Sequence, residues 1–246
     1  TFGATSGSVV VVDVHTGEVL AMVNSPSYNP NNRKNTEIHR FRNRAITDSI
    51  EPGSIVKPLP VLAALENGTA DMNTVIQTGY GPIMVGGRRV KDTHGYGDLD
   101  LTGIMRKSSN IGVTKLALNM PHEDLLKLYY DMGLGAETGL GLQGESAGML
   151  RERARWSDHE RATLSFGYGL SVTAVQMAKM YSAIANGGVV RPLSIIKAET
   201  PPEGMRVVSE QNADAMVEML EQVTEKGGTA TKARVAGYRV GGKTGT

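Results

Sequence analysis

The sequence predicts a mixed α/β (α+β) fold in which several helices pack against a sheet. Two apolar, β-branched runs joined by a glycine turn open the chain. Segments with helical apolar periodicity follow, and a strand-like segment closes it. With 246 residues, 40% of them hydrophobic, the chain suits one large domain or two small ones with a sizeable core.

The first fifth of the chain predicts a β-hairpin followed by surface loops. Residues 8–14 and 18–24 are the two apolar runs, and His15-Thr16-Gly17 between them supplies the turn. Residues 24–32 are rich in Asn, Pro and Ser, which predicts a loop. Residues 33–44 are polar and basic, so we expect them at the surface.

Residues 55–65 are apolar on nearly every face, which is typical of a buried helix. Asn67-Gly68 gives it a natural end. Pro58 and Pro60 fall inside this stretch, and proline beyond the first turn removes a helical hydrogen bond. We therefore expect a kinked or irregular first turn.

The middle of the chain predicts a loop-rich insertion and two short helices. Residues 71–98 combine many glycines with short strand-like pieces. Helices are predicted over 109–118 and over 121–132, the second with Gly133 as its C-cap. Residues 133–148 are a glycine-dense loop.

The last third predicts helices over 173–185 and 209–225 and a strand over 238–246. Each helix carries an apolar stripe: Val175, Ala178, Tyr181 and Ala185 on the first, and Met216, Leu220 and Val223 on the second.

Composition excludes several classes of function. The formal net charge of +1 gives no electrostatic case for nucleic acid or an anionic membrane surface. The absence of cysteine excludes disulfides and thiolate chemistry. The five histidines show no ligand spacing, so we predict no metal and no cofactor. No apolar run approaches a membrane span, and the start at Thr1 rather than Met suggests an excised piece.

Ser54-Ile55-Val56-Lys57 is an S-x-x-K pattern at the start of the predicted buried helix. One helical turn separates the two side chains, so they share a face. A serine hydroxyl is a weak nucleophile until a base takes its proton, and a lysine whose pKa is lowered by burial or a nearby cation can serve. Unpaired backbone N–H groups at the helix start can face a developing oxyanion.

Two further patterns follow in order. Ser108-Ser109-Asn110 is an S-x-N, offering a hydroxyl for proton relay and an amide for a substrate backbone. In the closing Lys243-Thr244-Gly245-Thr246, alternate threonines of a strand share one face, and the glycine permits close approach of the backbone.

Each short pattern is weak by itself. The chain holds a second S-x-x-K at Ser194 and a second S-x-N at Ser27. Taken alone, Ser54 and Ser108 are better explained as helix caps than as catalytic residues, and Lys243 could be a solvated strand residue. The order and context of all three patterns match the set found in penicillin-binding proteins and class A β-lactamases.

Longer segments carry a specific resemblance that extends over essentially the whole chain. The sequence is similar to the class B penicillin-binding proteins of the division type, the penicillin-binding protein 3 group of peptidoglycan D,D-transpeptidases. The matching segments are residues 42–48, 51–58, 101–110 and 166–173.

The resemblance implies roles for individual residues. Ser54 would be the acylated nucleophile, Lys57 its general base, and Ser108 the link from Lys57 to Lys243. Asn110 would bind the substrate amide. The substrate carboxylate would be held by Lys243, Thr244 and Thr246, with Gly245 allowing the backbone to come close, and the backbone N–H groups of Ser54 and Thr246 would bind the oxyanion. The rim of the cleft would be formed in part by Tyr168 and Thr93. For Tyr168, a packed loop aromatic is an equally good reading.

The resemblance also implies partners and a location. Substrates would be peptidoglycan stem peptides ending in D-Ala-D-Ala, and β-lactams would acylate Ser54. Septal glycan polymerase and division proteins would be partners. An N-terminal anchor outside this stretch would hold the protein in the bacterial inner membrane, with this domain in the periplasm at the septum.

The family fold has a five-stranded antiparallel sheet flanked by helices. Two strands and the last helix follow the K-T-G segment in that fold, so we expect residues 1–246 to be a transpeptidase domain incomplete at its C-terminus. Unpaired sheet edges favour aggregation, which leaves an inactive fragment as one alternative. A β-lactamase and a β-lactam sensor are the others, although no Glu is followed four residues later by the Asn of class A deacylation.

Overall fold

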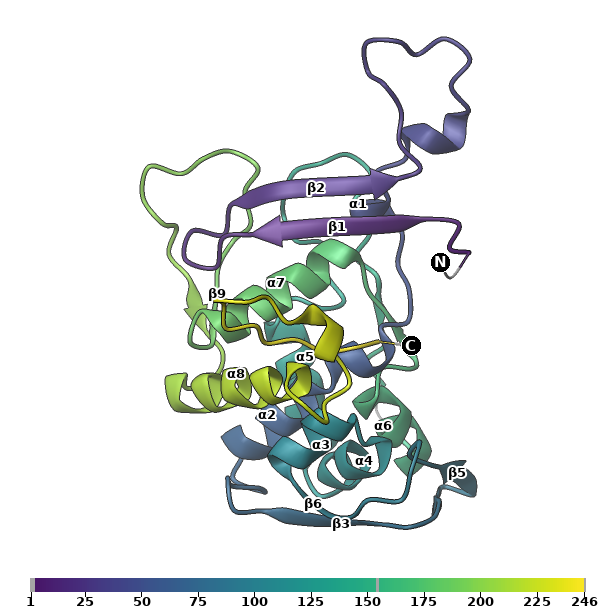
Figure 1. Ribbon diagram of the computed structural model, residues 1–246, viewed down its shortest axis with the longest axis vertical. Helices are drawn as coiled ribbons and strands as arrows, with labels where there is room; N and C mark the ends of the chain where they lie inside the picture. Colours follow the sequence, from purple (N-terminus) through teal and green to yellow (C-terminus); the bar gives the residue numbers. More distant parts are fainter. Residues whose placement is uncertain (1–2, 154, 246) are drawn as a thin grey trace.

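The computed structural model describes residues 3–153 and 155–245, and Figure 1 shows its layers. The predicted hairpin is confirmed: β1 (Gly7–Val12) pairs antiparallel with β2 (Val19–Ser25), with Val9 opposite Val23. It lies across α7 (Ala174–Ala185), and the helices below form the main core (Figure 1). Gly17 at the turn has φ +76°, and a Cβ there would lie 2.2 Å from a backbone oxygen.

The predicted buried helix is confirmed, including its irregular start. A 3₁₀ turn, η2 (Gly53–Val56), precedes α2 (Pro58–Glu66), and residues 58–64 are all buried. Pro58 is the first helical residue and Pro60 still lies in the first turn. Backbone N–H groups in a first turn have no intrahelical partner, so neither proline breaks a hydrogen bond there.

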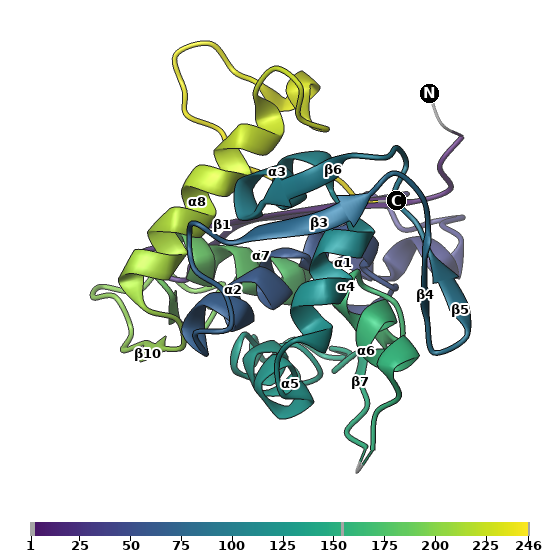
Figure 2. The same cartoon turned by 90° about the horizontal axis from the view of Figure 1, so that it is seen from below.

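The loop-rich insertion contains two small ladders, visible from below in Figure 2. β3 (Val75–Gly79) pairs antiparallel with β6 (Gly97–Asp100). β4 (Ile83–Val85) pairs with β5 (Arg88–Val90) around a glycine turn. The insertion is therefore more regular than the sequence suggests.

Four predicted helices form with the expected ends. They are α4 (Asn110–Leu118), α5 (His122–Asp131), α7 and α8 (Glu210–Thr224). The hydroxyls of Ser109, Thr173 and Ser209 accept the N-cap hydrogen bonds of α4, α7 and α8. The stripe predicted for α7 is partly wrong, because Ala185 is exposed while Met180 and Ile184 face the core.

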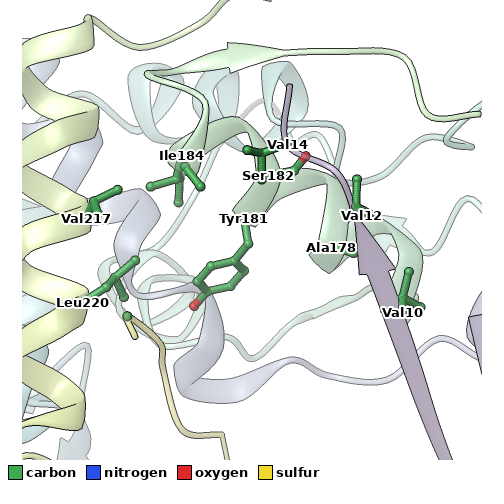
Figure 3. A pocket seen from close by; sticks show the side chains of 11 residues that line it. Val10, Val12, Val14, Ala178, Tyr181, Ser182, Ile184, Val217 and Leu220 are labelled. Carbon is green, nitrogen blue, oxygen red and sulfur yellow. The ribbon is translucent and has the colours of Figure 1, made fainter. Parts of the chain in front are cut away.

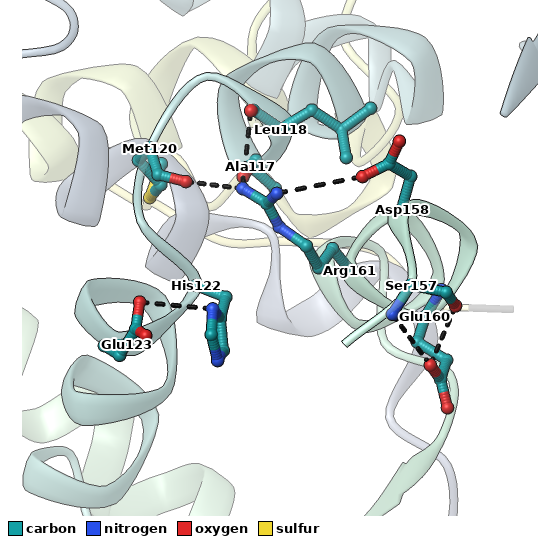
Figure 4. Close-up of polar contacts among 9 residues, drawn as sticks. All are labelled: Ala117, Leu118, Met120, His122, Glu123, Ser157, Asp158, Glu160 and Arg161. Atoms are coloured by element: carbon teal, nitrogen blue, oxygen red, sulfur yellow. Dashed lines mark hydrogen bonds and ion pairs between the residues drawn. The ribbon is translucent and has the colours of Figure 1, made fainter. Parts of the chain in front are cut away.

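Two helices of seven or more residues are not predicted from the sequence: α3 (Leu101–Lys107) and α6 (Asp158–Ser165). Both helices have capping residues at their N-termini that the sequence contains. Asp100 caps α3, and Ser157 and Glu160 form a capping box at α6. In Figure 4 the Arg161 guanidinium of α6 donates to backbone oxygens at the end of α4, which joins the two helices.

Short elements make the remaining connections. They are η1 (Ile38–Phe41), α1 (Arg44–Thr47), β7 (Met149–Leu150), β8 (Leu170–Ser171), β9 (Val189–Val190), β10 (Met205–Arg206) and η3 (Thr231–Ala233). The pairs β7–β8 and β9–β10 are antiparallel. No helix within the described part of the chain is both long and apolar enough to cross a membrane.

The strand predicted over 238–246 is wrong for the residues described, 238–245, which join no ladder. The segment is attached to α8 instead. Gly242 N–H donates to the Leu220 carbonyl (3.1 Å), and the Thr224 hydroxyl donates to the Val240 carbonyl (2.7 Å). A ladder requires a neighbouring strand, and no strand lies beside this segment in the described residues.

An apolar groove lies beside β1. The groove has a volume of about 330 Å³ and separates β1 from α8 and Gly241 (Figure 3). Val10 and Val12 line one side, Val217 and Leu220 the other, and Tyr181 of α7 forms the floor. The side of β1 that faces away from β2 has no strand partner among the described residues.

Candidate active site

The segment around Ser54 is a tight turn that packs on a glycine loop. Side chains three residues apart lie directly above one another in a 3₁₀ turn. The turn η2 therefore places the side chains of Ser54 and Lys57 on the same side. Gly53 N–H donates to the Gly167 carbonyl (3.0 Å). On the other side, the Tyr181 hydroxyl of α7 donates to the Ile55 carbonyl (2.8 Å). The half-buried Ser54 is thus held from two directions.

Lys57 is fully buried, and its ammonium nitrogen has three oxygen partners. These are the Ser108 carbonyl (2.5 Å), the Ser108 hydroxyl (3.1 Å) and Asn110 Oδ1 (2.7 Å). Burial, the larger cause, and the positive charge of Lys243 together lower the pKa of Lys57 to about 7, although the negative charge of Asp92 opposes them. A large fraction of Lys57 is therefore neutral near pH 7 and able to accept a proton.

Ser108 occupies the junction between α3 and α4 in a left-handed conformation, with φ +56°. The N–H groups of Ser108 and Ser109 close the end of α3 on the carbonyls of Met105 and Ile104. This conformation is uncommon for a residue with a Cβ, and it directs both the carbonyl and the hydroxyl of Ser108 at Lys57.

The K-T-G segment reaches the same cluster from the opposite side. Lys243 Nζ lies 2.9 Å from the Ser108 hydroxyl, which therefore sits between the two lysines. Burial lowers the pKa of Lys243 to about 8. A Cβ on Gly245 would lie 3.0 Å from Ile55, so the backbone passes close to the Ser54 turn. The Thr244 hydroxyl lies 2.8 Å from that of Thr229.

The structure thus brings together four of the residues that the three patterns single out. Lys57, Ser108, Asn110 and Lys243 form one hydrogen-bonded cluster. Three separate parts of the chain, around α2, α4 and the C-terminal segment, contribute to it. Such an arrangement can carry a proton from the Ser54 side to a leaving group through a hydroxyl and two amines.

The peripheral candidates do not touch this cluster directly. The exposed Thr93 pairs its hydroxyl with Tyr96 (3.0 Å). Tyr168 is 44% exposed and meets Phe166 edge-on, one residue beyond Gly167. Thr246 lies outside the described residues.

Asp92 is a residue that the sequence did not reveal. Its carboxylate accepts from the Ser109 hydroxyl and from the N–H groups of Asn110 and Ile111. It lies 17 residues before Ser109 in a glycine-rich insertion, and no local pattern marks it.

Within residues 3–153 and 155–245, no three His, Asp or Glu side chains gather closely enough to hold a metal ion. The chemistry available at the site comes from the hydroxyl of Ser54, the two amines and the backbone N–H groups of η2.

Comparison with known proteins agrees with this geometry. The Penicillin binding protein transpeptidase domain family matches residues 7–246. The chain is 51% identical over 243 residues to the peptidoglycan D,D-transpeptidase FtsI of Escherichia coli, covering 99% of this chain and 41% of that protein. It is 44% identical to the probable peptidoglycan D,D-transpeptidase PenA of Neisseria gonorrhoeae, covering 99% of this chain and 42% of that protein.

Solved structures show the same fold. The transpeptidase domain of Burkholderia pseudomallei penicillin-binding protein 3 superposes with a TM-score of 0.91 at 43% identity, covering 99% of this chain and 70% of that chain. The chain spans about two fifths of the length of these curated relatives. It belongs to the penicillin-binding protein transpeptidase domain family.

Proposed function

We propose that this domain is the catalytic part of a peptidoglycan D,D-transpeptidase, with Ser54 as nucleophile and Lys57 as general base. The observation that carries the proposal is the buried Lys57 amine, one 3₁₀ turn from Ser54, with a pKa lowered to about 7. A base with a pKa near the working pH is the most effective proton acceptor.

The reaction follows from the cluster. Ser54 Oγ attacks the carbonyl of the penultimate D-Ala while its proton passes to Lys57 Nζ, and the D-Ala–D-Ala amide bond breaks. The Ser108 hydroxyl, between Lys57 and Lys243, gives its proton to the departing D-Ala nitrogen and takes one from Lys57 Nζ, which is thereby neutral again. The amino group of a second stem peptide then attacks the Ser54 ester, forms the cross-link and restores the hydroxyl.

The remaining candidates bind rather than react. Lys243, Thr244 and Thr246 hold the terminal carboxylate of the stem peptide, and Gly245 admits its backbone. Asn110 faces the substrate amide, while Tyr168 and Thr93 flank the cleft. Backbone N–H groups of Ser54 and Thr246 stabilise the oxyanion. These roles rest on the resemblance and on the cluster geometry.

A labelling experiment tests the proposal. A fluorescent penicillin should add once to the full-length protein, and the adduct should map to Ser54 by mass spectrometry of the digested protein. Ser54→Ala should abolish it. Ser194→Ala is the matched control, because Ser194 opens the second S-x-x-K, and its hydroxyl bonds to the Ile196 backbone instead of a lysine. An adduct that persists in Ser54→Ala, or that Ser194→Ala removes, contradicts the assignment.

The lifetime of that adduct separates the transpeptidase from a β-lactamase. No Glu in the chain is followed four residues later by Asn, so we expect the ester on Ser54 to persist for many minutes. Rapid turnover of a chromogenic cephalosporin would favour the β-lactamase alternative.

We further propose that the domain acts in septal wall synthesis. Anchored at the inner membrane with its catalytic face in the periplasm, it would work beside a glycan polymerase and division proteins. The support is the division-type resemblance of residues 42–48, 51–58, 101–110 and 166–173. A fluorescent fusion of the full-length protein should gather at the septum, and a uniform envelope distribution would contradict this.

The domain is proposed to need strands from outside residues 1–246. The support is the apolar groove between β1 and the segment at Gly241. By the resemblance, the two strands that follow the K-T-G segment would fill this groove.

A further inference from the structure

The Asp92 carboxylate connects the insertion (residues 71–98) to the catalytic cluster, because both of its oxygens accept hydrogen bonds from residues 109–111. Oδ2 accepts from the buried Ser109 hydroxyl at 2.6 Å. Oδ1 accepts from the N–H groups of Asn110 at 2.6 Å and Ile111 at 3.1 Å. These N–H groups belong to the first turn of α4, which has no intrahelical partner for them. The carboxylate therefore supplements the cap that the Ser109 hydroxyl provides.

The neighbouring residue fixes the Asn110 side chain. Asn110 Nδ2 donates to the Lys91 carbonyl at 3.0 Å, which leaves Oδ1 facing Lys57 at 2.7 Å. Lys91 and Asp92 thus hold the side chain and the backbone of the same asparagine. Ser108, two residues earlier in the same turn, has a left-handed backbone conformation.

We propose that Asp92 is a positioning residue of the transpeptidase centre: its carboxylate holds the Ser108–Asn110 turn against Lys57 and places a negative charge near the Lys57 amine. This inference rests on the proposed function of Ser54 and Lys57. Asp92 touches neither substrate nor the Ser54 hydroxyl in this assignment and acts through Asn110 and Lys57.

Charge gives the carboxylate a second effect. The charged groups that act on Lys57 are Lys243, on the C-terminal segment, and Asp92, on the insertion. Lys243 lowers the pKa of Lys57 and Asp92 raises it, against the larger lowering caused by burial. Without Asp92, Lys57 would lose its proton at a lower pH.

Two substitutions separate geometry from charge. Asp92→Asn keeps the shape and removes the charge, whereas Asp92→Glu keeps the charge and displaces the carboxylate. The second-order rate of acylation of the full-length protein by a fluorescent penicillin is measured from pH 5 to pH 9, with the melting temperature as a check on folding. Asp98→Asn, an exposed aspartate of the same insertion, is the control and should match the unaltered chain in rate and midpoint.

Asp92→Asn should lower the plateau rate by roughly 10-fold to 100-fold, the effect of losing hydrogen bonds to a charged group. Its rate should reach half of its own plateau at a lower pH than the unaltered chain. Asp92→Glu should lower the plateau and leave the midpoint in place. If both Asp92 variants show the same plateau rate and the same pH midpoint as the control, the proposal is overturned. It is also overturned if the loss of acylation rate in both variants is matched by a loss of folded protein.

A titration without substrate keeps this test independent of the proposed function. In protein labelled with ¹³C at lysine Cε, the Lys57 signal, assigned through Lys57→Arg, should titrate at lower pH in Asp92→Asn. If the unaltered chain forms no penicillin adduct, the proposed function fails while this shift still decides the role of Asp92. An unchanged Lys57 titration would refute the electrostatic part.

Discussion

The chemistry at Ser54 depends on one buried amine. Lys57 is the largest charged side chain that the core encloses, and all its polar partners are oxygen atoms of Ser108 and Asn110. A buried ammonium is costly unless it is well paired, so burial favours the neutral amine. The packing that buries Lys57 in the core therefore also lowers the pKa of its amine, which allows it to act as a general base.

The pH dependence of acylation should report this amine. Lys57 accepts a proton only when neutral, so the acylation rate should rise with pH and pass its midpoint near the pKa of about 7. Stopped-flow labelling with a fluorescent penicillin between pH 5 and pH 9 measures it. Lys57→Ala should lower the plateau roughly 1,000-fold, the scale of a lost general base. A rate independent of pH across this range would contradict the role of Lys57.

Removal of the neighbouring lysine should move that midpoint. The charge of Lys243 lowers the pKa of Lys57, so Lys243→Ala should raise it and shift the acylation midpoint to higher pH. The plateau should also fall because the substrate carboxylate loses a partner. The midpoint separates the two effects, and a midpoint that stays in place would show that Lys243 does not act on Lys57.

At the scale of elements, two glycine-rich segments meet behind the nucleophile. Gly167 is buried with φ +91°, and a Cβ there would lie 2.0 Å from the Gly53 carbonyl oxygen. Gly53, itself at φ +56°, donates its N–H to Gly167. Only residues without a side chain permit this approach, so the loop after α6 fixes the entry to η2.

Gly167→Ala should damage both stability and acylation. The left-handed backbone and the clash with Gly53 together should cost about 2 to 4 kcal/mol. Gly139→Ala is the matched control, since Gly139 has φ +83° with open space around it, and it should cost only about 1 to 2 kcal/mol. Urea denaturation and penicillin labelling measure the two effects. Equal losses in the two variants would show that the Gly53 contact is unimportant.

The elements that the sequence predicted are those with strong local signals. The hairpin, the buried helix after Ser54 and the capped helices α4, α7 and α8 all carry such signals. Helices α3 and α6 have caps but short, mixed apolar patterns, and they were missed. The strand predicted over 238–246 is wrong over the described residues 238–245, because strand formation depends on a partner that no local pattern supplies.

At the scale of the whole molecule, an apolar groove lies beside the edge of β1 that has no strand partner among the described residues. Val10 and Val12 face it, and α7 presents Tyr181 at its floor (Figure 3). Unpaired strand edges next to an apolar groove promote association between molecules. We therefore expect residues 1–246 alone to be less stable than the full-length protein.

Hydrogen exchange tests the proposed strand addition. In residues 1–246, the β1 amides that point away from β2 should exchange as fast as loop amides, and in the full-length protein they should be protected. β2 amides that bond to β1 should be protected in both and serve as the internal control. Full protection of β1 in residues 1–246, together with complete penicillin labelling, would show that no further strands are needed.

The sequence by itself determined the three patterns, the nucleophile candidate and the ends of the best-capped helices, because each depends on residues close together in the chain. Only the tertiary structure decided that Ser108 sits between two amines, that Asp92 reaches Asn110 and that residues 238–245 join no ladder. Those features depend on contacts between distant segments, and on how burial and neighbouring charge shift a pKa, which composition and spacing do not specify.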